Sequence, residues 1–263
     1  MSVNVTSSSE LAVKPRLFAD AGDEVQAPGP EVAATKSRSD KVKVPNYLNA
    51  HYWWAYVHPN AVWFFERPWL VNLILFGNYR RLRDAALAEF AAPLPGRTLQ
   101  AACVYGDLTP RLYRQVSESD GRLDVVDVLP IQLENLAKKL PEDSTARLLC
   151  MDSTNLDVRP GHYDRALIFF LLHEQPAAER KKTLSELIRV VKPGGKIVIV
   201  DYAKPRRWHP LRYFMRPLLA VLEPFALDLW RDEIAKWLPP SAAARARKEY
   251  IFGGLYQKIV IDV

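Results

Sequence analysis

Cysteine is scarce in this chain, which has Cys103 and Cys150 and no other cysteine among 263 residues. Two thiols are too few for a zinc cluster built on cysteine ligands. Each cysteine lies in or beside an apolar segment that reads as a strand. We therefore expect two buried, reduced thiols, as in a protein of a reducing intracellular compartment.

Long apolar runs are also missing. The longest run near the amino terminus, residues 69–76, is interrupted by Asn72. It falls well short of the roughly 20 apolar residues that cross a bilayer. The amino terminus lacks the basic start and apolar core of a cleavable signal. The sequence therefore predicts neither a spanning helix nor a leader, and we expect a cytoplasmic location.

The chain has no dense basic block of the kind that follows nucleic-acid phosphates, although its formal net charge is +6. Its arginines are instead interleaved with aromatic residues. After residue 203 the basic members are Arg206, Arg207, Arg212 and Arg216, and the aromatic members are Trp208, Tyr213 and Phe214. This mixture favours an anionic membrane surface over nucleic acid, with peripheral attachment to the inner membrane. A solvated basic surface on a soluble enzyme is the alternative.

Composition divides the chain into segments. Residues 1–44 are rich in Ser, Ala, Pro, Asp and Glu without periodicity, which is typical of a disordered tail. Residues 45–263 are expected to form one catalytic domain. Within it, residues 45–92 are crowded with aromatic residues, and Pro59 and Pro68 divide them into short helices ahead of a longer one. Residues 203–240 form a basic, aromatic insertion.

Strand-like and helix-like segments alternate between these two regions. The strand candidates are residues 99–104, 123–128, 148–151, 166–172 and 197–200, and the helices between them are residues 109–117, 130–140 and 177–191. This order predicts a parallel sheet with helices on both faces. Residues 253–261 read as a hairpin into a last strand.

Residues 184–202 are the most informative stretch. Leu184, Leu187 and Val191 recur at helical spacing, the sequence Lys-Pro-Gly-Gly then turns the chain, and residues 197–200 read as a buried strand. This combination resembles the late sheet region of class I S-adenosylmethionine-dependent methyltransferases. The resemblance implies a Rossmann-like α/β fold with a mostly parallel seven-stranded sheet, preceded by the aromatic helices and carrying the insertion after its fifth strand.

The turn after the first strand departs from the pattern of these enzymes. Ligands of this fold bind beyond the carboxyl ends of the strands. Methyltransferases usually have an acid at the position of Gln100 and glycines at the positions of Ala102, Val104 and Gly106, of which Gly106 alone is present. The missing glycines normally allow the backbone to approach the methionine part of the cofactor. The departure indicates either lost cofactor binding or a pocket of different shape.

Three acids argue against loss of binding. Asp127 ends the second strand, where an acid accepts hydrogen bonds from both ribose hydroxyls. Asp152 ends the third strand, where members of the family contact the adenine amino group. Asp164 starts the fourth strand. Each acid alone is equally well explained as a turn residue, but their order matches the family.

A second group follows the fourth and fifth strands. His173 and Glu174 follow the fourth strand and Asp201 ends the fifth, so their side chains are expected to converge. One nitrogen and two carboxylates suit Mn²⁺ or Mg²⁺. The alternative is a structural histidine next to an acid at a helix start.

A narrower resemblance rests on four motifs. They are the altered turn Val-Tyr-Gly-Asp at residues 104–107, the aromatic residues 52–59, Trp-Leu-Val-Asn at residues 69–72 and Leu-His-Glu at residues 172–174. Together with Gly-Gly-Leu-Tyr-Gln-Lys at residues 253–258, they resemble the rhodoquinone-biosynthesis family RquA over residues 45–263. That family implies replacement of a methoxy group of ubiquinone by an amino group taken from S-adenosylmethionine, with manganese required.

The resemblance assigns roles to particular residues. Val104, Tyr105, Gly106, Asp127 and Asp152 would bind S-adenosylmethionine. Val104 and Tyr105 would turn its amino group toward the ring. Asp107 or His173 would accept a proton from that amine. Manganese at His173, Glu174 and Asp201 would polarise a quinone carbonyl.

Two other functions fit the sequence. One is ordinary methylation of a quinol or a lipid-like phenol. The other is a non-catalytic, membrane-bound subunit of quinone biosynthesis that has lost its cofactor.

Overall fold

The computed structural model describes residues 44–48, 50, 59–90 and 93–263. Residues 1–43 of the tail predicted for residues 1–44, and the aromatic residues 51–58, lie outside the described residues. Both cysteines are free thiols, as expected, but each is half-buried rather than buried.

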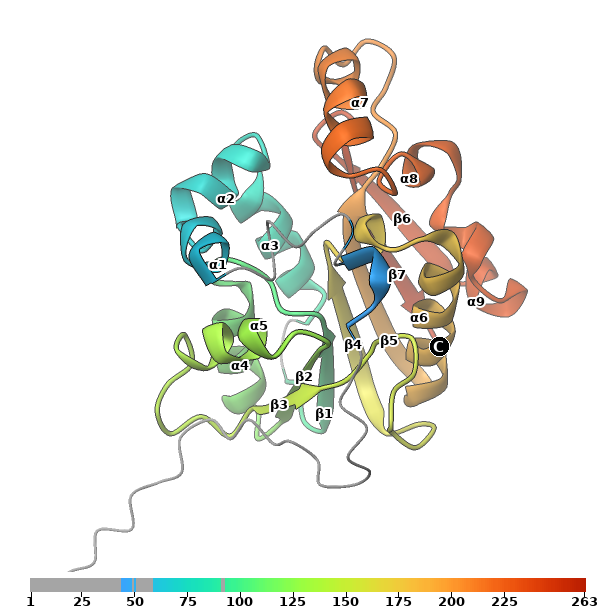
Figure 1. The fold of residues 1–263 in the computed structure, drawn as a ribbon. Coiled ribbons are helices and arrows are strands. Elements are labelled where there is room, and N and C mark those ends of the chain that lie inside the picture. Colours follow the sequence, from blue (N-terminus) through green and yellow to red (C-terminus); the bar gives the residue numbers. More distant parts are fainter. Residues whose placement is uncertain (1–43, 49, 51–58, 91–92) are drawn as a thin grey trace, which may run out of the picture.

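A seven-stranded sheet forms the centre of the molecule (Figure 1). Its strands are β1 (Arg97–Ala101), β2 (Arg122–Asp127), β3 (Arg147–Cys150), β4 (Tyr163–Phe169), β5 (Val191–Tyr202), β6 (Ala246–Ile251) and β7 (Tyr256–Asp262). Their order is β3-β2-β1-β4-β5-β7-β6. The first five are parallel, and β7 runs antiparallel to both β5 and β6. The prediction of a mostly parallel, Rossmann-like sheet is confirmed.

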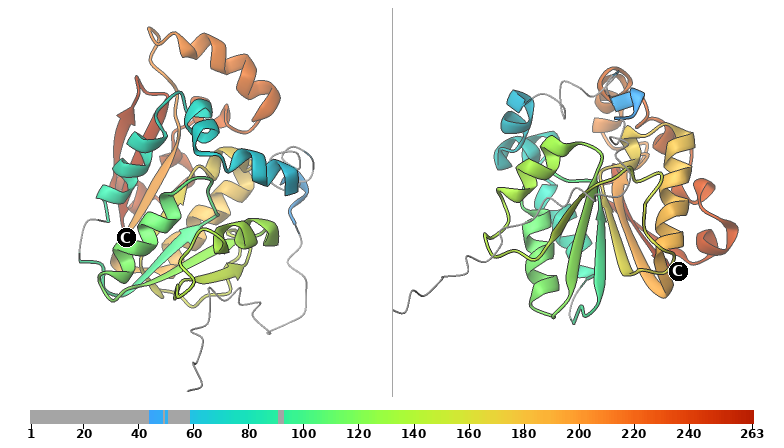
Figure 2. Two further views of the ribbon diagram at one scale, coloured as in Figure 1. Left: turned by 90° about the vertical axis from the view of Figure 1, so that its left-hand side faces the viewer. Right: turned by 60° about the horizontal axis from the view of Figure 1, so that its bottom comes forward.

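Helices cover both faces of the sheet (Figure 2). The helices are α1 (Pro59–Phe65), α2 (Pro68–Ile74), α3 (Tyr79–Ala88), α4 (Leu108–Ser117), α5 (Pro130–Ala137), α6 (Ala177–Val190), α7 (Leu211–Leu222), α8 (Asp228–Arg231) and α9 (Pro240–Ala244), with 3-10 turns η2 (Leu172–Glu174) and η3 (Ile234–Trp237). The short α1 and α2 followed by the longer α3 agree with the pattern predicted from the prolines.

The Lys-Pro-Gly-Gly sequence was expected to form a turn ahead of the strand. In the structure it is instead an irregularity inside β5. Val191 pairs with Tyr163, the register then shifts, and Lys196 pairs with Arg165. Gly195 is required here, because a Cβ atom would stand 2.6 Å from the backbone oxygen of Asp164. Beyond the irregularity, residues 197–200 are at most 1% exposed, as predicted for a strand covered on both faces.

The loops at the carboxyl ends of the parallel strands position the site. Helices α1, α2 and α7 lie beyond this end of the sheet in both views (Figures 1 and 2). Asp164 lies at the opposite end. Its carboxylate accepts a hydrogen bond from the backbone N–H of Arg97 at 2.7 Å and pairs with Lys192, so it stabilises the start of β4 and contacts no site residue.

Candidate functional site

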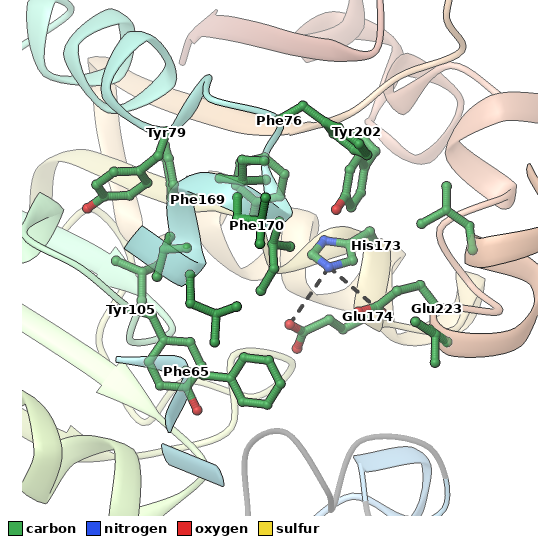
Figure 3. Close-up of a pocket in the computed structure, with 18 of the residues that line it drawn as sticks. Phe65, Phe76, Tyr79, Tyr105, Phe169, Phe170, His173, Glu174, Tyr202 and Glu223 are labelled. Carbon is green, nitrogen blue, oxygen red and sulfur yellow. Dashed lines mark ion pairs between the residues drawn. The ribbon is translucent and has the colours of Figure 1, made fainter. Parts of the chain in front are cut away.

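A large apolar cavity of about 450 Å³ lies beyond the carboxyl ends of β1, β4 and β5 (Figure 3). Its walls come from α1 to α3, the turn after β1, the segment after β4, the end of β5 and α7. Most of the lining is aromatic or aliphatic, and the charged or amide side chains on it are Gln132, His173, Glu174 and Glu223. An apolar chamber with a few polar groups suits a small, mostly hydrophobic ligand.

A narrower cleft adjoins the large cavity. Asp127, Asp152 and Ser153 line it, together with Tyr47 and Leu48 from the segment before α1. Cys103, Gln132, Phe170 and Glu174 line both spaces, so the two spaces are direct neighbours. A ligand in the cleft would therefore lie next to the apolar cavity.

The turn after β1 keeps the backbone of a glycine turn without the glycine. Ala102 has a φ of +68°, in the left-handed region that L side chains rarely adopt. Gln100, where methyltransferases usually have an acid, is buried and donates to the Ala102 carbonyl at 3.0 Å and to Thr109 at 2.9 Å. The side chain of Val104 fills space on the wall of the large cavity.

Gly106 is confined by α3. It has a φ of +86°, and a Cβ atom would stand 2.5 Å from the Tyr79 hydroxyl. That hydroxyl accepts the backbone N–H groups of Asp107 at 2.8 Å and Leu108 at 3.0 Å, so it caps the start of α4. Gly106 lines neither space, and its backbone N–H donates to Glu66.

Glu66 and Lys139 connect the entry helices to this turn. Lys139 Nζ donates to both oxygens of Glu66 at 3.0 and 3.1 Å and to the carbonyls of Val104 and Gly106. Glu66 also accepts from Asn135 at 2.7 Å. Sequence reasoning missed both residues, because nothing in the spacing of positions 66 and 139 links them.

Asp127 is fixed at the end of β2 inside the cleft. Its two oxygens accept the backbone N–H groups of Cys103 at 2.7 Å and Leu129 at 2.8 Å. Burial raises the pKa of Asp127 from 3.8 to about 6, against the lowering effect of these donors. Asp152 lies across the cleft and accepts the N–H of Thr154. Both acids are placed to accept hydrogen bonds from a nucleoside.

Asp107, which the sequence suggested as a proton acceptor, does not face either space. Its carboxylate is bound by Arg83 at 2.8 Å and by Arg111 at 2.6 Å, and it lines neither space. Burial acts in the opposite direction, but these two arginines lower the pKa of Asp107 to about 2. Asp107 therefore stabilises the junction of α3 and α4.

Tyr105 lies on the cavity wall. Its ring stacks on Phe65 with the ring centres 6.1 Å apart, and its hydroxyl accepts a hydrogen bond from Gln132 at 3.0 Å. Burial raises the pKa of Tyr105, so the phenol is neutral.

His173 is the buried centre of a group of acids. Its Nδ1 lies 3.0 Å from Asp201, whose carboxylate also accepts the backbone N–H groups of Leu172 at 2.9 Å and Tyr202 at 2.7 Å. Asp201 is completely buried and lines neither space. It orients the imidazole, with Nε2 on the side of the cavity.

Two carboxylates face that second nitrogen (Figure 3). Nε2 lies 3.8 Å from Glu174 and 3.9 Å from Glu223. Burial disfavours a charged imidazole, but Asp201, Glu223 and Glu174 outweigh it and raise the pKa of His173 from 6.5 to about 9. His173 therefore holds a proton at neutral pH. Glu223, which directly follows α7, was missed because the insertion offers no motif at that position.

The predicted manganese site does not fit the residues as they lie. Within the described ranges, no group of three or more His, Cys, Asp or Glu side chains is arranged to hold a metal ion. Asp201 was expected to be a ligand, but its oxygens are directed at His173 and at backbone N–H groups. Asp201 is thus a positioning residue for His173.

Comparison with known proteins finds similarity in the central part of the chain. Residues 98–195 match the model of a methyltransferase domain. The chain is 32% identical over 139 residues to the ubiquinone/menaquinone biosynthesis C-methyltransferase UbiE of Syntrophotalea carbinolica, covering 52% of this chain and 56% of that protein. It is 29% identical to the demethylmenaquinone methyltransferase of Staphylococcus saprophyticus, covering 52% and 57%. The chain thus spans little more than half the length of these relatives.

A third relative matches over more of its length. An uncharacterized methyltransferase of Synechocystis is 25% identical over 207 residues, covering 75% of this chain and 92% of that protein. Among solved structures, the methyltransferase domain of bacterial CtHen1 superposes with a TM-score of 0.53 at 20% identity, covering 71% of this chain and 99% of that domain. The chain therefore has the Rossmann-like methyltransferase fold, and its central part is similar in sequence to ubiquinone and menaquinone C-methyltransferases.

Proposed function

We propose that this protein is an S-adenosylmethionine-dependent transferase that replaces a methoxy group of ubiquinone by an amino group, which gives rhodoquinone. The observation that carries the proposal is the junction of the acidic cleft with the large apolar cavity at the altered turn. Val104 and Tyr105 project into the cavity where ordinary methyltransferases have a glycine-rich turn. The names of the quinone-pathway relatives support a quinone as the acceptor.

The cleft would hold the donor. Asp127 would accept hydrogen bonds from the ribose hydroxyls, and Asp152 would accept one from the adenine amino group. Bound S-adenosylmethionine supplies the transferred nitrogen. Val104 would exclude the methionine part from its ordinary path, so that the amino group rather than the methyl group points at the acceptor.

The cavity would hold the quinone ring and the start of its prenyl chain. Phe65 and Tyr105 offer aromatic faces on one side, and His173 lies on another. Because His173 carries a proton at neutral pH, it is placed to donate a hydrogen bond to a quinone carbonyl oxygen, which makes the ring carbons more electrophilic. Glu174 or Glu223 would then take the proton that the attacking amine releases and pass it to the methoxy group, which would leave as methanol. The bond between the transferred nitrogen and Cα of the donor would break by elimination, with a proton moving from the donor's Cβ to the nitrogen, so that no oxidant or reductant is needed. His173 is thus a donor in this scheme rather than the base expected from the sequence.

Methylation of a quinol is the second candidate, favoured by the methyltransferase names of the relatives. The same cleft and cavity accommodate it, with the methyl group as the transferred part. A non-catalytic subunit fits less well, because Asp127 and Asp152 remain in a cleft next to the cavity.

Isotope labelling separates these functions. Purified protein is incubated with short-chain ubiquinone, or its quinol, and S-adenosylmethionine labelled with ¹⁵N in one sample and with ¹³C-methyl in another. Amination transfers ¹⁵N, methylation transfers ¹³C, and a non-catalytic protein transfers neither. The reactions are run with and without added Mn²⁺, which tests the manganese requirement implied by the resemblance to RquA. Incorporation of ¹³C without ¹⁵N would refute amination.

A further inference from the structure

Exposed hydrophobic side chains are gathered at one end of the molecule. Among the described residues, all the large ones but Tyr250 lie on α1, on α2 or between residues 208 and 222. They are Trp63, Phe64, Trp69, Leu73, Ile74, Trp208, Tyr213, Phe214, Val221 and Leu222. Several are more than half exposed, including Trp69 at 57%, Trp208 at 68% and Val221 at 80%. Such a concentration marks an interaction surface, since single exposed apolar residues would be scattered.

The mouth of the large cavity lies within this surface. Leu73 and Ile74 on α2 and Leu222 at the end of α7 line the cavity, yet they are 64%, 43% and 39% exposed. Residues that are both lining and exposed mark where the cavity opens. The opening therefore lies between α2 and α7, which stand beyond the same end of the sheet (Figure 1).

Each of these helices has two apolar sides. On α7, Met215 and Leu219 are buried and line the cavity, whereas Phe214 and Val221 are exposed. On α2, Leu70 lines the cavity, whereas Trp69 is exposed. The inner sides are explained by the cavity, and the outer sides require an apolar environment outside the protein.

The charge around the mouth identifies that environment. Residues 203–222 contain Lys204, Arg206, Arg207, Arg212 and Arg216 and no acidic residue. Arg206, Arg207 and Arg216 are exposed next to Trp208 and Phe214. Tryptophan favours the depth of lipid head groups, and arginine is attracted to anionic lipids. No helix in the described part of the chain is long and apolar enough to cross a bilayer, so contact would be at the surface.

We propose that α1, α2 and the segment 204–222 dock on an anionic lipid bilayer, with the cavity mouth between α2 and α7 facing the membrane. A lipid-soluble ring could then pass from the bilayer into the cavity without crossing water. The identity of that ring rests on the proposed function, but the docking does not. The membrane is favoured over a protein partner, because the apolar residues occupy two separate elements around an opening rather than one groove.

Vesicle sedimentation tests the docking. The full chain is mixed at low salt with vesicles of phosphatidylcholine alone or with phosphatidylglycerol. We expect binding to the anionic vesicles, reduced by salt. The triple variant Trp69→Ser/Phe214→Ser/Val221→Ser should lose at least about tenfold in binding, since large apolar side chains no longer leave water. The matched control is Tyr250→Ser. Tyr250 lies on β6, its side chain is 49% exposed, and this variant should bind like the wild type.

Charge is tested separately. Arg207→Gln/Arg216→Gln should weaken binding about fivefold for each charge removed, whereas Arg122→Gln, at the opposite end of the sheet, should not. The proposal is overturned if the wild type does not bind anionic vesicles at low salt. Binding of the triple variant equal to that of the wild type would also overturn it. So would a wild type that forms a dimer in light scattering and binds no vesicles, if the triple variant is a monomer.

Tryptophan quenching tests the orientation. Vesicles with brominated acyl chains should quench the protein's fluorescence. Trp69→Phe and Trp208→Phe should each reduce the quenched fraction, but the buried Trp230→Phe should not. Quenching that depends on neither exposed tryptophan would overturn the orientation. These readouts need no turnover, so they remain interpretable if labelling refutes the proposed reaction.

Measurement of turnover tests whether the substrate enters the cavity from the membrane. With short-chain quinone in solution the triple variant should work at the wild-type rate, because none of its three positions lines the cavity. With long-chain quinone embedded in vesicles its rate should fall as its binding falls. Equal rates on embedded quinone would overturn entry from the bilayer.

Discussion

Replacing Asp201 by asparagine tests whether this carboxylate keeps His173 protonated. Asp201 lies 3.0 Å from His173 Nδ1 and is completely buried. Asparagine has the same shape and keeps one carbonyl oxygen for the backbone N–H groups, but it carries no charge. We expect the pKa of His173 to fall from about 9 to its ordinary value of 6.5 or below, because burial is then opposed by Glu174 and Glu223 alone.

The size of the effect follows from the raised pKa. The pKa of His173 is 6.5 in the unfolded chain and about 9 in the folded protein, and this difference contributes about 3 kcal/mol to the free energy of unfolding. The folded state binds this proton more tightly than the unfolded state. The stabilisation is therefore fully present below pH 6.5 and is lost as the pH rises through about 9.

Urea denaturation measures this contribution of His173 to the free energy of unfolding. The free energy of unfolding is determined from about pH 6 to about pH 10 for the wild type, Asp201→Asn and His173→Gln. The His173→Gln variant is the matched control, since it lacks the titrating ring and keeps Asp201 with its backbone hydrogen bonds. The wild type should lose about 3 kcal/mol relative to this control across the range, and Asp201→Asn should lose little.

Parallel curves for the wild type and His173→Gln would refute the reasoning, because they would mean that His173 has the same pKa in the folded and unfolded states. A wild-type nuclear magnetic resonance titration that places His173 at or below its ordinary value would refute it independently.

Three further predictions concern the turn and the cleft. Asp127→Asn should weaken S-adenosylmethionine binding in calorimetry by roughly tenfold or more, because hydrogen bonds to a charged acceptor are lost; unchanged affinity would remove Asp127 from the donor site. Ala102→Gly should raise the free energy of unfolding in urea by about 0.5–1 kcal/mol, since relief of the left-handed strain exceeds the added entropy of the unfolded chain; a decrease would contradict this. Val104→Gly should leave the affinity for S-adenosylmethionine within about threefold but lower ¹⁵N transfer about tenfold or more; an undiminished rate would show that Val104 does not orient the donor.

Local patterns predicted the elements of the sheet. The run at residues 197–200, the acid at the end of β2 and the acid after β3 each depend on neighbours in sequence, and each lies where it was expected. Alternating strands and helices leave few possible topologies, so the position of Asp127 at the cleft follows from its position along the chain.

Contacts between distant segments were not predictable in this way. Asp107 lies next to the expected donor turn, but Arg83 and Tyr79 on α3 bind its carboxylate and hold it away from both spaces. Glu223 follows a helix in the insertion, fifty positions after His173, and joins the site because α7 folds back over the cavity. A single sequence carries no local signal for either arrangement.

The division of the site between two parts of the chain has a consequence for its specificity. The two acids of the cleft, Asp127 and Asp152, lie inside residues 98–195, the part that matches the methyltransferase domain. The outer walls of the large cavity come from α2 and α7, on either side of that part. Changes in α2 and α7 can therefore reshape the large cavity without altering Asp127 or Asp152. Under the proposed function, the choice of acceptor would then be set by segments that flank the donor-binding sheet.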